Sequence, residues 1–329
     1  MRSSTVKMSV LCTVIAAVTA SQPSFARERA DLPAWLRTHV GEGANQIAGP
    51  VLLRARALHM EKVRAGTITN SCYFAMDATR PNNANDDNTD GRFYVICEGE
   101  RSFTAIPAGH GSGRNLKGVA DFANGRRCAK NFGNAQDSEL TAGGVYVTAD
   151  IRTSFKGYYR GASGQSEPFV RSFIQFEGEG DTANARRREI GGHAAVALKG
   201  VCLRKDPSSP YAKQDGYVPF GQLVEYTGGR SNGCTSWTST DARQIAALVN
   251  NSPTTLYIYP EAADIHAVAQ AIAAGRSPQS EGLYWDQSCL SEIGSPKFWS
   301  RGILEPIIAR YKEEHPAPPA RPTPLCAER

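Results

Sequence analysis

The sequence predicts a mainly β fold with flanking helices, in the α+β class. Apolar, aromatic-rich runs of strand length follow one another between Thr67 and Pro260. Glycine-rich segments, which permit tight turns, separate several of these runs. Helical spacing of apolar residues precedes this region at 32–65 and follows it at 262–275. A chain of 329 residues is long enough for one large domain or two modest ones.

Residues 1–26 predict a cleaved export signal. Arg2 and Lys7 form a basic start, an apolar run covers 8–20, and Ser24-Phe25-Ala26 places small residues where a signal peptidase reads. The run is too short for an ordinary membrane span, although an uncleaved anchor is the alternative, and no stretch of 18 apolar residues occurs elsewhere. We therefore expect a periplasmic or otherwise exported protein without a stable membrane span.

The next segments are predicted in order along the chain. Residues 27–66 form a helical N-terminal extension with two short helices, broken at 41–43 and at Gly49-Pro50, which we expect to pack outside the main domain. The main domain covers 67–260. Residues 261–329 form a helical C-terminal extension that ends in a proline-rich tail, which we expect to be extended and held by Cys326.

The main domain begins with a predicted hairpin. Its strands are CYFAMDAT at 72–79 and RFYVICEG at 92–99, and the polar segment between them has the composition of a turn. Acidic and asparagine side chains in that segment suggest calcium, but their spacing does not match an EF-hand, so a solvated loop is favoured. Further strands are predicted at 145–151, 173–178, 190–198 and 254–260, and a further helix at 241–250, and the segment 223–229 leads to the motif that contains Cys234.

Seven cysteines remain after removal of the signal, so at least one has no partner within the chain. They are Cys72, Cys97, Cys128, Cys202, Cys234, Cys289 and Cys326. Disulfides persist outside the cytosol. The predicted hairpin places Cys72 and Cys97 at its open end, within bridging reach if the register allows it. Counting alone does not show which cysteine is free.

The charge pattern does not predict a nucleic-acid partner. The net charge is +5, acidic and basic residues are interspersed, and the one dense basic run, at 186–188, is short and followed by Glu189. No compact spacing of histidine, cysteine and carboxylates predicts a metal site, and no cofactor is expected.

Cys234 lies in the sequence RSNGCTSW, where it reads as a reactive thiol, half of a disulfide or a buried small hydrophobe. A reactive thiol needs a base or a positive neighbour. His193 and His110 are the histidines with glycine-rich surroundings, which let a substrate approach the backbone, whereas the other four lie in predicted helices or in the tail.

Five segments, HGSGRN, FANG, GGVYVT, DTANARRREIGGHAA and GRSNGC, resemble the catalytic domain of L,D-transpeptidases, in the murein L,D-transpeptidase subgroup, over residues 67–258. The resemblance implies a YkuD-like β-sandwich or barrel. It implies that Cys234 is the nucleophile, that His193 is the base and then the acid, and that Ser231 and Gly233 shape an oxyanion-binding turn. Candidate substrate-binding residues are His110, Arg114, Asn124, Arg186 and Arg230.

The implied reaction joins peptidoglycan stem peptides through an acyl-enzyme, without a cofactor. Many members have glycine after the histidine and arginine two residues after the cysteine, whereas this chain has Ala194 and Ser236, and Thr235 replaces a proline of the subgroup. These departures concern the donor and acceptor pockets. If Cys234 remains a thiol, the other six cysteines are free to form three bridges.

Four alternatives use the same residues differently. The Cys–His pair also suits an L,D-carboxypeptidase or endopeptidase, if water resolves the acyl-enzyme. An exported wall-binding protein of the same fold without activity is the non-enzymatic alternative. A papain-like hydrolase is disfavoured because only His266 and His315 follow Cys234, and a thiol oxidoreductase because there is no C-x-x-C pair.

Overall fold

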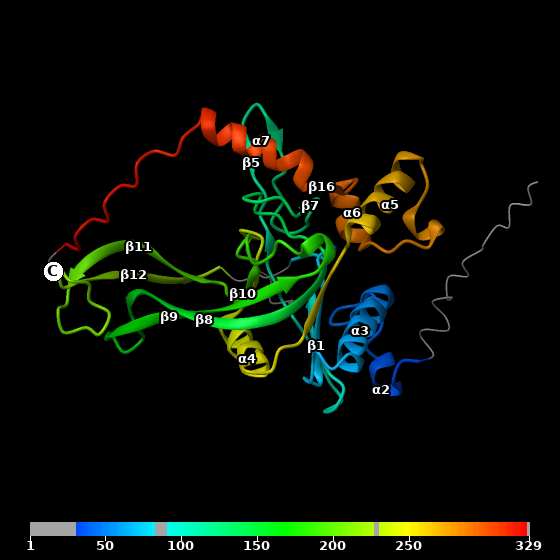
Figure 1. Ribbon diagram of the computed structural model, residues 1–329, viewed down its shortest axis with the longest axis horizontal. Helices are drawn as coiled ribbons and strands as arrows, with labels where there is room; N and C mark the ends of the chain where they lie inside the picture. The colour runs from blue at the N-terminus through cyan, green and yellow to red at the C-terminus, as the bar shows by residue number, and fades with distance from the viewer. Residues whose placement is uncertain (1–30, 83–90, 227–229, 328–329) are drawn as a thin grey trace, which may run out of the picture.

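The computed structural model describes residues 31–82, 91–226 and 230–327. The predicted signal peptide lies outside the described residues, as do residues 83–90 of the polar loop and residues 227–229. A large mixed sheet with several helices makes up the regular structure of the described part, which confirms the prediction of a mainly β fold in the α+β class (Figure 1).

Ten strands form the large sheet, in the order β14-β10-β9-β8-β15-β1-β2-β3, with β12 paired to β8 and β11 paired to β12. Their bounds are β1 (Cys72–Asp77), β2 (Phe93–Cys97), β3 (Ser102–Ile106), β8 (Gly144–Arg160), β9 (Ser166–Gly178), β10 (Gly191–Ala194), β11 (Val196–Lys205), β12 (Tyr217–Glu225), β14 (Thr235–Trp237) and β15 (Thr255–Tyr259).

Short strand pairs and helices surround the sheet. The short strands are β4 (His110–Gly111), β5 (Asn115–Leu116), β6 (Ala120–Asp121), β7 (Asn131–Gly133), β13 (Arg230–Ser231) and β16 (Lys297–Trp299). The helices are α2 (Ala34–Arg37), α3 (Gly49–Arg64), η1 (Gly180–Thr182), α4 (Ser239–Val249), α5 (Ala262–Ala273), η2 (Pro278–Glu281), α6 (Gln287–Ile293) and α7 (Arg301–Glu314).

The predicted hairpin is confirmed, and so is the pairing at its open end. β1 and β2 are antiparallel with Cys72 opposite Cys97, and these two cysteines form a disulfide. Two further disulfides join Cys128 to Cys289 and Cys202 to Cys326. Three disulfides are typical of proteins that fold in an oxidising compartment outside the cytosol.

Alternation along β1 divides the core into two layers, because successive side chains of a strand point to opposite faces. Tyr73 and Ala75 belong to a cluster with the N-terminal helices, whereas Phe74 and Met76 belong to a second cluster on the other face. All four are at most 1% exposed, so β1 is buried on both faces.

The N-terminal helical segment covers the outer face of the sheet, as the sequence predicts, and shares a core with it (Figure 1). Its predicted break at Gly49-Pro50 is instead the beginning of α3, because proline fits the first turn of a helix, where its missing N–H is not needed. Val51 and Leu52 of α3 are fully buried against the sheet.

The opposite face is covered by α4 and α5. Trp237 at the end of β14 packs in this cluster with Ile245 of α4 and Ile265 of α5, and all three are at most 1% exposed. The side chain of Thr238 accepts a hydrogen bond from the backbone N–H of Asp241 and so caps α4, close to the beginning of the helix predicted at 241–250. The cap begins α4 directly after the segment that carries Cys234.

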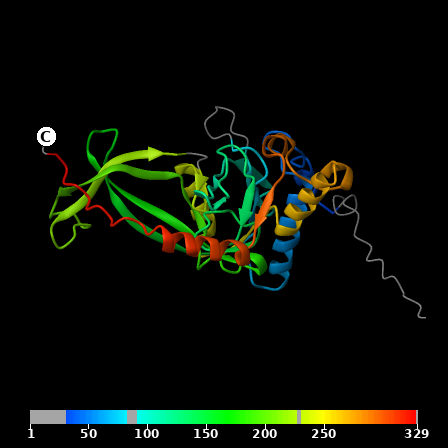
Figure 2. The same cartoon turned by 90° about the horizontal axis from the view of Figure 1, so that it is seen from above.

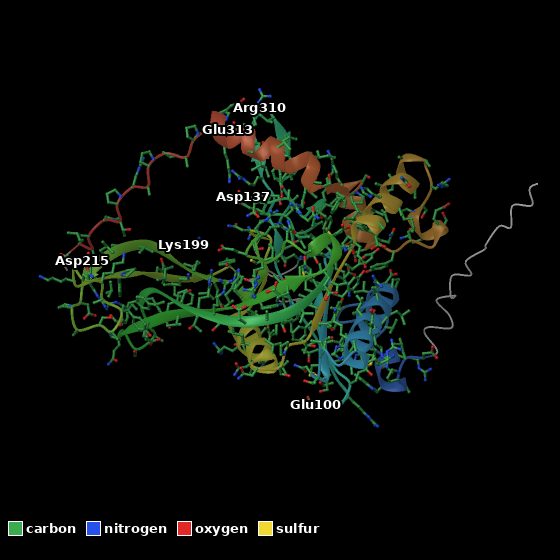
Figure 3. The ribbon with its side chains drawn as sticks, viewed as in Figure 1. Glu100, Asp137, Lys199, Asp215, Arg310 and Glu313 are labelled. Carbon is green, nitrogen blue, oxygen red and sulfur yellow. A yellow bond between two sulfur atoms is a disulfide. The ribbon has the colours of Figure 1, made fainter. Side chains whose placement is uncertain are left out.

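The outer halves of β8 and β9 extend away from the helices together with β11 and β12, and we call these four segments the arm (Figures 1 and 2). Asp215, which precedes β12, lies near the tip of the arm (Figure 3). One predicted strand, 190–198, is in fact two strands: β10 pairs with β9 and β14, and β11 pairs with β12.

The proline-rich tail runs from α7 to the tip of the arm, as Figure 2 shows. It has no regular secondary structure between 316 and 324, which confirms the predicted extended tail. Besides the Cys202–Cys326 disulfide, the N–H of Leu203 donates to the carbonyl of Pro324 (2.7 Å) and the N–H of Cys326 donates to the carbonyl of Leu203 (2.9 Å). The tail is thus attached at both ends.

Candidate active site

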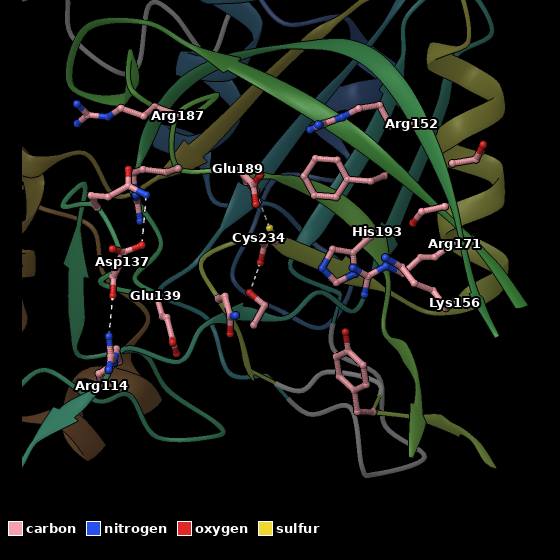
Figure 4. A pocket seen from close by; sticks show the side chains of 18 of the residues that line it. Arg114, Asp137, Glu139, Arg152, Lys156, Arg171, Arg187, Glu189, His193 and Cys234 are labelled. Atoms are coloured by element: carbon pink, nitrogen blue, oxygen red, sulfur yellow. Dashed lines mark hydrogen bonds between the residues drawn. The ribbon is translucent and has the colours of Figure 1, made fainter. Parts of the chain in front are cut away.

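Cys234 and His193 line the same cleft, which has a volume of about 1060 Å³ (Figure 4). Its walls come from β8 and β9, from the segment 136–139, from the segment 187–189, from the turn at 231–234, and from α7. Segments that are remote in sequence therefore meet around one cysteine and one histidine.

Pairing between β10 and β14 sets the relative position of the two residues. These strands are parallel, with Gly192 opposite Thr235 and His193 opposite Ser236, so Cys234 immediately precedes the paired segment. A Cβ atom on Gly192 would lie 2.0 Å from the ring of Trp237, which explains why glycine precedes His193. The close approach lets β10 lie directly against the strand that follows Cys234.

The turn before Cys234 is held by its own residues. The hydroxyl of Ser231 donates a hydrogen bond to the carbonyl of Cys234, so Ser231 braces the turn. Gly233 has φ +99°, a region that residues with a side chain rarely adopt, and an added Cβ would lie 2.9 Å from the carbonyl oxygen of Leu140. Both residues fit the predicted turn.

Replacing Gly233 by alanine is expected to destabilise the protein and to slow any reaction of Cys234. Gly164 also has a positive φ, of +79°, but an added Cβ there meets nothing within 4 Å. We expect Gly233→Ala to lose about 1–3 kcal/mol more stability than Gly164→Ala, because only the first change forces a close contact. Urea denaturation of both variants measures this, and equal losses would contradict the steric argument.

Among the residues that the structure describes, Cys234 is the one cysteine outside a disulfide. It is 9% exposed, and its thiol donates to the carbonyl of Glu189 over 3.4 Å. Burial raises the pKa of this thiol, and this effect outweighs a backbone hydrogen bond at Gly191 and the positive charges of Arg171 and Arg188, which lower it. The resting group is therefore a neutral thiol.

His193 is also buried and neutral. Its Nδ1 lies 2.8 Å from the carbonyl of Ala194, and because a carbonyl only accepts, Nδ1 carries the ring proton and Nε2 is an acceptor. The pKa of His193 is lowered to about 4: burial is the main cause, the hydrogen bond to Ala194 opposes the shift, and the charges of Arg171 and Lys156 add to it. A neutral imidazole of this tautomer can accept a proton from a thiol.

The buried His193 ring is expected to make stability fall with acidification. Its pKa is about 4 in the folded protein and about 6.5 in an unfolded chain, so between these values the unfolded chain binds the extra proton. This contribution is fully present above pH 6.5 and is lost as the pH falls through 4, by about 3 kcal/mol in total. Urea denaturation between pH 7 and 4 measures the slope. His193→Gln should flatten it, and an unchanged slope in that variant would refute the assignment.

The cleft is strongly basic, a property that the sequence analysis missed. Seven basic and three acidic side chains line it: Arg114, Arg152, Lys156, Arg171, Arg187, Arg188, Lys312, Asp137, Glu139 and Glu189. The sequence signal for this basic cleft is the alternation of Arg152, Ser154 and Lys156 in a predicted strand region, because alternate residues of a strand share a face. The run at 186–188, dismissed as a short basic stretch, supplies Arg187 and Arg188.

The positive charge is distributed unevenly about Cys234 (Figure 4). On the side away from His193, Lys312 pairs with Asp137 at 2.5 Å and Arg187 with Glu305 at 3.6 Å. Asp137 lies below α7 in the view of Figure 3. On the side of His193, Lys156 and Arg171 have no ion-pair partner within the described part of the chain.

Two predicted substrate-binding residues, His110 and Asn124, are buried among hydrogen-bond partners outside the lining of the cleft. His110 is fully buried, with Nδ1 2.9 Å from the guanidinium of Arg92 and Nε2 3.1 Å from the carbonyl of Gly125. Asn124 donates to the carbonyls of Gly111 and Asn131, and its side-chain oxygen accepts from two backbone N–H groups. Neither lines the cleft. His110 and Gly111 form β4, which pairs with β13 at the beginning of the turn that carries Cys234. Asn124 binds the carbonyl of Gly111, so both His110 and Asn124 support this turn through β4.

The remaining candidates divide. Arg114 lines the cleft and donates to the carbonyl of Asp137 at 3.4 Å. Arg186 lies outside the cleft, where it forms ion pairs with Asp150 and Glu177 and so braces β8 and β9. Arg230 lies in β13, and its backbone pairs with His110 of β4. The side chain of Arg230 is outside the described part.

Comparison with known proteins identifies no family: the sequence matches no protein-family model and no curated protein. The residues of known placement contain no group of three histidine, cysteine or carboxylate side chains that could hold a metal ion. In the same residues no helix combines the length and the apolar character needed to cross a membrane.

Proposed function

We propose that this protein is a cysteine-dependent L,D-transpeptidase that cross-links peptidoglycan stem peptides outside the cytosol. One observation carries the proposal: the unpaired cysteine of the described residues and His193 line a single basic cleft. The three disulfides support a site of action where thiols are oxidised, and a thiol left unpaired there is consistent with use in chemistry.

The resemblance to the YkuD-type catalytic domain supports the same proposal. Its residues are the ones that meet in the cleft: the histidine on β10, the turn with Ser231 and Gly233, and Cys234 at its end. We therefore propose a YkuD-like catalytic unit for 67–260. Ala194, Thr235 and Ser236 depart from the subgroup and lie on the two paired strands beside the cleft.

The first half-reaction forms a thioester. The sulfur of Cys234 attacks the peptide carbonyl on the L side of a bond to a D-centre, a C–S bond forms and the C–N bond breaks. The thiol proton passes to Nε2 of His193 and then to the nitrogen of the leaving amine. Backbone N–H groups at Gly233 and Cys234 face the developing oxyanion.

The second half-reaction regenerates the thiol. An amine from a neighbouring stem peptide attacks the thioester carbonyl, gives a proton to His193, and a new C–N bond replaces the C–S bond. The sulfur then recovers its proton from His193. If water takes the place of the amine, the same pair gives an L,D-carboxypeptidase or endopeptidase.

The test is mass spectrometry of the products formed from disaccharide-tetrapeptide by residues 27–329, with the Cys234→Ala form as the matched control. New dimers from the intact protein that are absent with Cys234→Ala support the transpeptidase. Shortened monomers without dimers would assign a hydrolase. Both forms are also incubated with purified sacculi. If both bind the sacculi and neither changes the peptides, the protein is a wall-binding protein and not an enzyme.

A further inference from the structure

The arm contributes a cluster of basic side chains to the face of the cleft beside His193. β8 and β9 are antiparallel with Ser154 opposite Arg171, so Arg152, two residues before Ser154, is a diagonal neighbour of Arg171 on the same face. Lys156 lies at the register shift between Phe155 and Gly157 and lines the same cleft. All four residues line the cleft. We call Arg152, Ser154, Lys156 and Arg171 the basic wall.

Only one member of the basic wall has charged or polar partners. Arg152 donates to the side chain of Gln175 at 2.5 Å and lies 3.5 Å from the carboxylate of Asp150. The side chains of Lys156 and Arg171 form no hydrogen bond or ion pair with any residue whose placement is described. Like charges at neighbouring cross-strand positions are destabilising, so this arrangement lowers stability without an internal anion to compensate it.

The charges of the basic wall act directly on the reacting groups. Burial lowers the pKa of Lys156, and the nearby charge of Arg171 lowers it further. Arg171 also lowers the pKa of both Cys234 and His193, although burial is the larger influence on each. The electrostatic effect on both residues agrees with Figure 4, where Arg171 and Lys156 lie beyond His193 as seen from Cys234.

The position of His193 decides which part of a substrate meets the basic wall. In the proposed reaction His193 gives its proton to the leaving amine, so the leaving residue lies on the side of His193. The groups beyond His193 on that side are unpaired cations with a hydroxyl between them. A carboxylate on the leaving residue would receive charge-assisted hydrogen bonds from them.

We propose that Arg171 and Lys156 bind the free terminal carboxylate of the residue that leaves, and so restrict the enzyme to donors cleaved at their last peptide bond. This inference rests on the proposed function. It assigns the specificity for the donor peptide to the arm, which contains none of the five sequence segments that resemble L,D-transpeptidases.

The experiment compares three donors that differ by one group: the tetrapeptide acid, the same peptide with a terminal carboxamide, and a peptide amidated only at the side-chain carboxylate of its third residue. We expect the intact protein to prefer the acid to the terminal amide by about 10–100-fold in kcat/KM, the range of a hydrogen bond to a charged group. Arg171→Gln should reduce the preference for the acid over the terminal amide to within a few-fold; the ratio is the readout, because loss of Arg171 also changes the charge near Cys234 and His193 and so affects both donors. Arg160→Gln, on the same strand as Lys156 but outside the cleft, is the matched control and should keep the preference.

Binding to Cys234→Ala, measured by calorimetry, separates this inference from the proposed function. One outcome supports the carboxylate site but contradicts the proposed transpeptidase activity. In it the intact protein converts no donor, Cys234→Ala binds the acid more tightly than the terminal amide, and Arg171→Gln in that background abolishes the difference. Equal binding or equal conversion of acid and terminal amide overturns the inference. A preference that depends on the third-residue carboxylate, or no binding of any donor, overturns it as well.

Discussion

Replacing Cys234 by serine is expected to lower the rate of acyl transfer by about 10⁴-fold or more, which is the scale of losses when a covalent nucleophile is removed. A serine hydroxyl holds its proton far more firmly than a thiol. His193, with a pKa of about 4, is too weak a base to remove it. The initial rate of dimer formation, compared between the two proteins at equal concentration, measures the loss.

The fold of Cys234→Ser should be intact, because serine is smaller than cysteine and can still donate to the carbonyl of Glu189. Thermal unfolding of both proteins provides the control. An intact, folded serine variant that forms dimers within tenfold of the original rate would show that the sulfur is not the nucleophile. Binding to the cell wall, by contrast, should be unaffected by Cys234→Ser.

Replacing His193 by glutamine is expected to slow the reaction by about 10²–10⁴-fold near neutral pH, the usual contribution of a general acid–base. Glutamine can still donate to the carbonyl of Ala194 but accepts no proton from a thiol. Binding of the donor should change much less, so kcat is expected to fall while KM stays within a few-fold. Single-turnover measurement of acyl-enzyme formation by intact-protein mass tests this step.

His59→Gln is the matched control for that loss. His59 is likewise buried, and burial lowers its pKa too, but it lies on α3 and contacts the hydroxyl of Thr255 at 3.1 Å, away from the cleft. This variant should lose stability without a change in kcat of the folded fraction. If both variants lose activity equally, the effect of His193→Gln is one of stability and not of proton transfer.

The elements that could be predicted from the sequence are those whose signals are local. The β1–β2 hairpin follows from two apolar runs around a polar segment, and its register brings Cys72 and Cys97 together as its ends suggest. Cys234 and His193 stand in short motifs, and both line the cleft. Within the turn, Ser231 donates to the carbonyl of Cys234 and Gly233 adopts a positive φ, and both residue types are local signals in the sequence.

The basic wall could not be predicted in the same way, because it depends on register. Arg171 meets Arg152 and Lys156 only through pairing between β8 and β9, and that pairing shifts between Thr148 and Ile151 and again between Phe155 and Gly157. No pattern in either strand reveals such shifts.

Partners distant in sequence explain why His110 is buried and does not line the cleft. A histidine between glycines suggests access to a substrate, but Arg92 of the preceding hairpin and Gly125 of a later loop take both of its ring nitrogens.

The attachment of the tail to the arm has a consequence for the integrity of the molecule. The disulfide between Cys202 and Cys326 joins residues 124 positions apart and closes them into a covalent ring that contains Cys234 and its turn. The residues from 316 to 324 are exposed along their whole length and have no regular secondary structure, so this part of the ring is open to a protease. A nick there opens the ring without dividing the molecule, since the two new ends remain joined through residues 202–315 and the disulfide.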